Sequence, residues 1–206
     1  MRIKFSETEI IDLLWAWAAL TFAFAVLLGG GIGSGFFMFL IISGLTIGLA
    51  FILHEMAHKF VAQRYGCWAE FRKWNFGLIL AVMMSFLGFI FAAPGAVMIS
   101  GMVSREQNGK ISAAGPLTNI ALAALFLLAK IFLLPQITGE AFFFVGLIVH
   151  VGLIANAFLA VFNLLPIPPL DGSKIMPWSF SLWLGIMVLA GFLVVIGYNS
   201  LRAFLS

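Results

Sequence analysis

Residues 36–63 read FFMFLIISGLTIGLAFILHEMAHKFVAQ, and this stretch decides the fold. Its first eighteen residues, Phe36 to Leu53, carry no charge. A helix needs about 20 mostly apolar residues to cross about 30 Å of hydrocarbon. His54, Glu55 and His58 follow this apolar run directly. The stretch therefore predicts a membrane-spanning helix that carries ionisable side chains near one end.

The composition of the whole chain agrees with a membrane protein. Of its 206 residues, 63% are hydrophobic and 9% are charged, and the mean hydropathy is +1.15. Soluble domains carry about 25% charged residues. The net charge of +3 arises from basic residues that flank apolar runs, where lipid headgroups of the bilayer account for them, so we predict no nucleic-acid partner. The single cysteine, Cys67, excludes an intramolecular disulfide.

Five largely apolar stretches are predicted to span the bilayer as helices. They cover residues 10–28, 36–63, 112–134, 141–165 and 179–201. No internal repeat or long linker separates them, and the polar loops are too short to fold alone. We therefore predict a single transmembrane domain over residues 1–206.

A sixth apolar stretch, residues 74–104, permits two interpretations. Residues 76–91 as a helix would descend about 24 Å, and about seven extended residues after the Pro94-Gly95 turn signal would return about 23 Å. The alternative is a sixth plain span. The predicted fold class is thus an all-α polytopic membrane protein of five to six transmembrane helices, with a re-entrant membrane-embedded hairpin, including a short β element, near residues 76–103. Such a backbone would mark a site, because it needs protein or water to satisfy its hydrogen bonds.

Charge placement favours the re-entrant hairpin. Lysine and arginine accumulate on the cytoplasmic side of short loops. If residues 76–101 return to their own side, nine of the eleven basic residues share one face, and the bias weakens if they cross. These nine are Arg2, Lys4, Lys59, Arg64, Arg72, Lys73, Arg105, Lys110 and Lys174. We predict a multi-pass protein of the cell membrane whose N-terminus is cytoplasmic, as is the face that carries His54, Glu55 and His58.

The chemistry is carried by His54-Glu55-Met56-Ala57-His58, which matches H-E-x-x-H. The two histidines are one helical turn apart on the same face, so both imidazoles can reach one Zn²⁺ ion. Glu55 can then act as general base towards a water molecule. Ionisable residues at membrane depth are costly unless they are paired or bind a metal.

A catalytic zinc site needs three protein ligands and one open position, so another segment must supply a ligand. Most other acidic residues lie in loops or near the N-terminus, whereas Asp171 follows an apolar run in the stretch NLLPIPPLDG, residues 163–172. With a re-entrant hairpin, Asp171 returns to the face that carries His58. With a sixth full span, it ends on the opposite face.

Together the two motifs resemble the site-2 protease family of intramembrane zinc metalloproteases, especially its compact archaeal and bacterial members. That family pairs H-E-x-x-H with N-x-x-P-x-P-x-L-D-G, and Asn163 to Gly172 matches every fixed position. The resemblance covers about residues 36–174, and it implies that residues 1–206 form a single transmembrane protease domain with its catalytic core there. It implies Asp171 as the third ligand of one zinc ion per chain. It also implies regulated intramembrane proteolysis, in which peptide bonds of transmembrane protein substrates are hydrolysed near the cytoplasmic side of the bilayer.

Two further stretches resemble the family less stringently, namely AGPLTN at residues 114–119 and PGAV at residues 94–97. In the family, the second belongs to a membrane-embedded β element thought to pair with substrate, so we predict substrate contacts for Pro94, Gly95, Ala96 and Val97. The long apolar lead-in, residues 76–91, departs from the shorter loop of some relatives. The alternative for both stretches is simple packing.

Two asparagines are candidate substrate ligands. The resemblance implies that Asn163 holds substrate or stabilises the oxyanion that forms as water attacks, and an amide donor suits that task. Asn119 is a second candidate. For both residues the alternative is interhelical hydrogen bonding.

Two rival functions remain compatible with the H-E-x-x-H motif. One is a membrane zinc protease that acts on soluble or lipidated chains at the cytoplasmic face, which usually requires a downstream Glu or His ligand and larger polar regions. The other is a metal transporter or a catalytically silent membrane chaperone. A transporter would carry acidic residues and histidines along several helices, whereas here they gather in two motifs.

Overall fold

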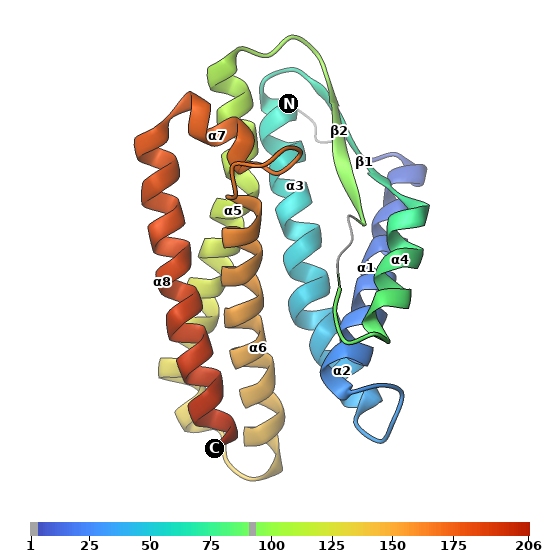
Figure 1. Cartoon of the computed structure of the whole chain (residues 1–206), viewed down its shortest axis with the longest axis vertical. Helices are drawn as coiled ribbons and strands as arrows, with labels where there is room; N and C mark the ends of the chain where they lie inside the picture. The colour runs from blue at the N-terminus through green and yellow to red at the C-terminus, as the bar shows by residue number, and fades with distance from the viewer. Residues whose placement is uncertain (1–3, 91–93) are drawn as a thin grey trace. The chain divides into compact units, whose positions relative to one another are not determined.

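Five helices in the described part of the chain, residues 4–90 and 94–206 of the computed structural model, are long and apolar enough to cross a membrane. They are Glu7–Gly29, Phe36–Arg64, Arg105–Gln136, Glu140–Asn163 and Phe180–Leu205 (Figure 1). The prediction of an all-α polytopic membrane protein is confirmed. The chain forms two compact units, Met1–Met102 and Val103–Ser206.

The first unit begins with α1, Glu7–Gly29, which starts three residues before the predicted span. The Ser6 side chain accepts a hydrogen bond from the Glu9 backbone N–H and so caps the helix at this earlier point. The next membrane-length helix consists of α2, Phe36–Ser43, a π-helical turn η1, Gly44–Gly48, and α3, Leu49–Arg64.

Close packing of α1 against η1 depends on small residues. The indole Nε1–H of Trp17 donates a hydrogen bond of 3.1 Å to the Gly44 carbonyl. A Cβ atom at Gly48 would lie 2.7 Å from the Trp17 ring. Glycine therefore lets the two helices approach closely, as is common in membrane proteins.

The remainder of the first unit is a two-stranded antiparallel hairpin with a helix in its connection. Strand β1, Trp68–Lys73, pairs with β2, Gly95–Ser100, in a register that places Phe71 opposite Val97. Helix α4, Asn75–Ser85, lies between them in the sequence and contacts α1 (Figure 1). Its 11 residues extend only about 16 Å, which is too short for a sixth span.

The helix in this connection ends earlier than the sequence predicted. The expected helix over residues 76–91 ends at Ser85, and a turn follows in which Gly88 adopts φ +85. A positive φ is easily reached only by glycine and stops a right-handed helix. Residues 91–93 of that prediction, and Arg2 of the predicted charge distribution, lie outside the described residues. The extended return after Pro94 is present as β2.

All the regular elements described in the second unit are helices. Helix α5, Arg105–Leu128, begins with a capping box formed by Ser104 and Gln107 and continues through a π-helical segment η2, Ala129–Leu133, and a 3₁₀ turn η3, Leu134–Gln136. It is followed by α6, Glu140–Asn163, the short α7, Gly172–Trp178, and α8, Phe180–Leu205.

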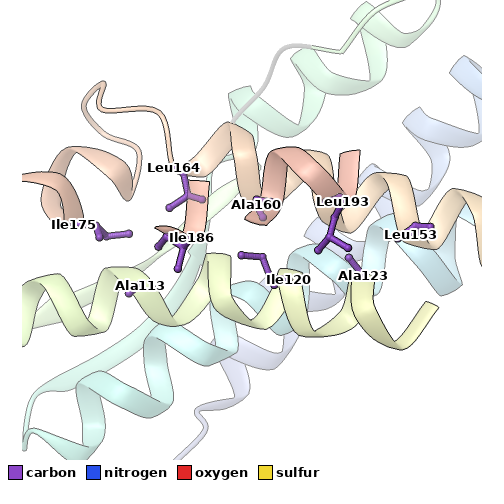
Figure 2. Close-up of a cluster of buried hydrophobic side chains, with 11 residues drawn as sticks. Ala113, Ile120, Ala123, Leu153, Ala160, Leu164, Ile175, Ile186 and Leu193 are labelled. Atoms are coloured by element: carbon purple, nitrogen blue, oxygen red, sulfur yellow. The ribbon is translucent and has the colours of Figure 1, made fainter. Parts of the chain in front are cut away.

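Alanines and aliphatic side chains fill the core of this second unit, where α5, α6 and α8 meet (Figure 2). Ala123, Ala157 and Ala160 have no exposed surface. Small side chains at such positions let membrane helices pack closely. The packed core fixes the end of α6, from which the second sequence motif continues towards α7.

Candidate metal centre

Helix α3 presents His54, Glu55 and His58 as one buried group. Their exposed fractions are 3%, 8% and 8%. The Nε2 atoms of the two histidines lie 3.0 Å apart, and the candidate ligand atoms of all three residues lie within 4.8 Å of one another. Because the histidines are four residues apart in an α-helix, they occupy consecutive turns of one face.

The donor set of this group fits a zinc ion. Zinc binds imidazole nitrogens at about 2.0–2.1 Å, so two such nitrogens on one tetrahedral ion lie about 3 to 3.5 Å apart. The 3.0 Å separation of the two Nε2 atoms falls in that range. The group formed by His54, Glu55 and His58 could therefore hold a metal ion.

The hairpin reaches this group through Val97. The Val97 backbone N–H donates a hydrogen bond of 2.9 Å to Oε2 of Glu55. Its partner across the sheet, Phe71, donates its own backbone N–H to Oε1 of Glu9, also at 2.9 Å. Both N–H groups thus point away from the opposite strand, as in a non-hydrogen-bonded antiparallel pair. The outer edge of β2 at Val97 faces Glu55.

The other predicted residues of the PGAV stretch lie beside Val97 in or next to β2. Pro94 is buried and directly precedes the strand, and the Ala96 side chain is exposed. Gly95 has φ +155, and a Cβ atom there would lie 2.5 Å from both the Arg72 carbonyl oxygen and the Phe71 ring. Gly95 therefore allows β2 to pass close to β1, which is a packing reason for this glycine. Contacts of the four residues with substrate stay a prediction.

Two ion pairs that were not predicted from the sequence join α1 to α3 and to β1 of the hairpin. Lys59, the residue after His58, pairs with Glu9, and both side chains have 0% exposure. Lys73 pairs with Asp12 at 2.5 Å, and the Lys73 side chain retains 23% exposure. A signal was present: Glu9 and Asp12 are three residues apart, on one face of a helix that is otherwise largely apolar.

Glu70 forms a more exposed connection between β1 and the start of α1. Partial burial disfavours the charged form of this carboxylate, but hydrogen bonds from Arg72 and Ser6 and the positive charge of Arg72 outweigh it. The pKa of Glu70 is therefore lowered from its ordinary value. The Ser6 hydroxyl donates to Oε2 of Glu70 at 3.1 Å, so the residue that caps α1 also contacts β1.

The second unit contains Asp171 and Asn163. Asp171 is 7% exposed and directly precedes α7. A Cβ atom at Gly172 would lie 2.0 Å from the Leu164 carbonyl oxygen, so glycine is required where this segment passes the end of α6. Asn163 is the last residue of α6, and its side-chain N–H donates to the Leu159 carbonyl at 3.0 Å. Their roles in metal and substrate binding stay predictions.

Asn119 contributes to a hydrogen bond between α5 and α6. Its side-chain N–H donates to Oδ1 of Asn156 at 3.0 Å, and the N–H of Asn156 donates to the Gly152 carbonyl at 2.9 Å. Both asparagines are almost fully buried. This geometry is what the alternative interpretation of Asn119, interhelical hydrogen bonding, predicts.

Comparison with known proteins gives two relatives. The chain is 41% identical over 182 residues to "Putative zinc metalloprotease MJ0611" of Methanocaldococcus jannaschii, which covers 87% of this chain and 89% of that protein. It is 31% identical over 146 residues to "Putative zinc metalloprotease YwhC" of Bacillus subtilis, covering 64% of this chain and 65% of that protein. No family model matches the chain, and no solved structure matches it.

Proposed function

Because the chain belongs to a family of zinc metalloproteases, we propose that it is an intramembrane endopeptidase of the site-2 type. It cleaves transmembrane protein substrates near the cytoplasmic side of the cell membrane. The observation that carries this proposal is the buried group of His54, Glu55 and His58 at the end of a helix long enough to span the bilayer. Ionisable side chains at membrane depth are costly unless they are paired or bind a metal, so their place on such a helix favours a metal centre that works within the bilayer.

Zinc is held in this proposal by His54, His58 and Asp171, one ion per chain. Asp171 is supported by its place in the NLLPIPPLDG motif, by its burial and by the oxygen ligand that its carboxylate offers. When bound, zinc supplies Lewis-acid polarisation of the scissile carbonyl and lowers the pKa of water. The hairpin, which does not form a sixth span, agrees with the topology that returns Asp171 to the face carrying His58.

Glu55 acts as general base and then as general acid. Its carboxylate accepts a proton from the attacking water and delivers it to the departing amine nitrogen as the peptide C–N bond breaks. The Val97 N–H that donates to Oε2 fixes the orientation of this carboxylate. A side-chain N–H of Asn163 is proposed to donate to the oxyanion that develops from the scissile carbonyl.

The substrate binds as an extended segment along the outer edge of β2. In a transmembrane helix each backbone carbonyl is engaged in the helix itself, so the scissile region must unwind before water can attack. An exposed strand edge offers backbone groups that replace the lost hydrogen bonds. The edge at Val97 adjoins Glu55, which brings the unwound segment to the catalytic group.

The test is cleavage of a single-span model substrate in liposomes by the parent chain and by Glu55→Gln, with zinc content measured on both. We expect the parent to cleave and the variant to lose activity by about 10³-fold or more, while both hold about one zinc per chain. Cleavage by Glu55→Gln at the parental rate would remove Glu55 from its assigned role.

A matched pair of substrates separates the proposal from its rival. The same peptide sequence is placed once inside the span and once in a soluble domain. Preferential cleavage inside the span is expected. Cleavage of the soluble form alone would assign the chain to membrane proteases that act on soluble proteins, and zinc without cleavage of either would favour a silent or metal-transporting protein.

A further inference from the structure

The first unit contains a buried ion pair that the proposed mechanism does not use. Glu9 on α1 and Lys59 on α3 have no exposed side-chain surface, and the Lys59 ammonium donates to Oε2 of Glu9. The Phe5 ring centroid lies 4.0 Å from the same ammonium. The second oxygen of Glu9, Oε1, accepts the backbone N–H of Phe71 at 2.9 Å. One carboxylate thus joins α3 to β1.

These contacts form a closed network that begins and ends on α3. Lys59 bonds Glu9, Glu9 bonds the Phe71 N–H, Phe71 lies opposite Val97 in the sheet, and the Val97 N–H bonds Glu55. Glu55 and Lys59 are four residues apart, so they stand one turn apart on one face of α3. Strand β2 is therefore connected to α3 twice: directly through the Val97 N–H, and indirectly through its partner strand β1 and Glu9.

The Phe71 side chain contributes to the same closed network of contacts. It is fully buried, and its ring packs edge to face against Phe51 of α3 with centroids 5.9 Å apart. The apolar contact holds the hairpin against α3 but has little directional preference. The Glu9–Lys59 pair and its bond to the Phe71 N–H supply direction, because hydrogen bonds to charged groups are both strong and geometrically specific.

We propose that Glu9 and Lys59 are positioning residues for the protease reaction. They hold the β2 edge and the Glu55 carboxylate in a fixed position relative to each other. The proposal rests on the proposed function for what is positioned. A buried ion pair contributes little net stability compared with an apolar pair of the same volume. Its value here is orientation: it keeps the Val97 N–H on Glu55 and the substrate edge beside the metal ligands.

The decisive variant is the double substitution Glu9→Gln/Lys59→Met. Either single change leaves a buried charge without its partner and is expected to destabilise the chain strongly. The double change removes both charges at similar volume, and the amide oxygen of Gln can still accept the Phe71 N–H. It therefore breaks the ionic link between α1 and α3, together with the contact of the Lys59 ammonium with the Phe5 ring, and is expected to unfold close to the parental midpoint.

Kinetics of the double variant distinguish positioning from folding. With rates normalised to zinc-loaded, folded protein, we expect kcat to fall about tenfold or more, since a small misplacement of a catalytic group can cost up to about 10²-fold. KM should change by less than about threefold, because the sheet that receives substrate remains paired. A parental kcat in the folded double variant would overturn the proposal.

Hydrogen exchange of the zinc-free chain provides a second readout that does not require catalysis. Amides of residues 95–100, which include Val97, should exchange about tenfold faster in the double variant, because the paired sheet opens locally more often once its anchor to α3 is weakened. Amides of residues 140–163 should exchange at the parental rate. Unchanged exchange of residues 95–100 would mean that the pair does not hold the β2 edge, which contradicts the proposal.

The Asp12–Lys73 pair supplies the matched control. This pair joins α1 to β1 through a carboxylate and a lysine, and the hydrogen bonds described for it link only these two elements. We expect Asp12→Asn/Lys73→Met to keep kcat within about twofold of the parent. An equal loss in this control would assign the effect to general anchoring of β1 and overturn the proposal. If the parent itself cleaves no substrate, the proposed function fails, and the exchange measurement alone decides whether the pair holds Val97.

Discussion

Asp171 and Gly172 illustrate what single residues contribute to this chain. Gly172 is required by geometry, because any Cβ atom would collide with the Leu164 carbonyl. Asp171 is buried although a carboxylate is costly to bury. The adjacent residues therefore have different reasons for their identity: the glycine lets the segment pass close to the end of α6, and the aspartate is proposed to bind the metal.

The role of Asp171 leads to a prediction about metal affinity. Asp171→Asn is expected to weaken zinc binding by about 100-fold or more, since even outer-shell changes typically cost 10- to 100-fold. Competition with a fluorescent zinc chelator measures this directly. The control is Glu106→Gln, which removes an exposed carboxylate paired with Lys110 in the same unit and should leave affinity unchanged. Parental affinity in Asp171→Asn would exclude the residue as a ligand.

Residues with distinctive chemistry could be identified from the sequence, whereas residues with ordinary chemistry could not. The spacing of His54, Glu55 and His58 requires only that the segment be helical, and α3 confirms it. The Glu9–Lys59 pair depends on which helices become neighbours, and helical periodicity does not encode that. Glu9 was placed before the first predicted span, yet it lies within α1 and is fully buried.

At the scale of elements, the hairpin pairs strand β2, which the sequence predicted, with strand β1, which was not predicted from the sequence. The Pro94-Gly95 signal and the apolar run after it predicted the extended return. Strand β1 was missed because its polar residues resembled a cytoplasmic loop. Its signal was alternation: Ala69 and Phe71 are fully buried, while the residues between and around them are not.

The tight passage of β2 over β1 leads to a prediction for Gly95→Ala. The added methyl group would clash with the Arg72 carbonyl and the Phe71 ring, and φ +155 is unfavourable for alanine. We expect a loss of about 1–3 kcal/mol in local stability of the hairpin, measured by hydrogen exchange of residues 68–73. Gly33→Ala serves as the control, because a Cβ atom there meets nothing within 4 Å. Equal protection in both variants would show that β2 has room for a side chain.

At the scale of the whole molecule, length and hydropathy were sufficient to predict five spans, and all five are present. Their ends differ by several residues because caps such as Ser6 and Ser104 decide where a helix begins. The division into two compact units was not apparent, because no linker composition marks the junction between residues 102 and 103. The prediction of a single protease domain stays a prediction.

Metal removal tests the proposed chemistry in the intact chain. Dialysis against a chelator should abolish cleavage, and stoichiometric zinc should restore it. Zinc at about 1,000 times its dissociation constant should stabilise the folded chain by about 4 kcal/mol, seen as a higher unfolding midpoint. Glu55→Gln should retain this zinc-dependent stabilisation, whereas the double variant His54→Ala/His58→Ala should lose it. Stabilisation of the double histidine variant to the parental extent would place the metal elsewhere.

The π-helical turn at Gly44–Gly48 has a consequence for how such chains can change over evolutionary time. A π-helical turn holds one residue more than an α-helical turn, so a single deletion here can be absorbed as a regular α-helical turn that leaves the H-E-x-x-H motif facing the same way. A single deletion in the regular helix between Leu49 and Leu53 would instead rotate the motif by about 100°. The 29-residue helix would remain long enough to cross the membrane, yet its metal-binding face would point elsewhere. Deletions in homologous chains should therefore fall in this turn or in connections such as residues 30–35 and 137–139, and residues 49–58 should align without gaps.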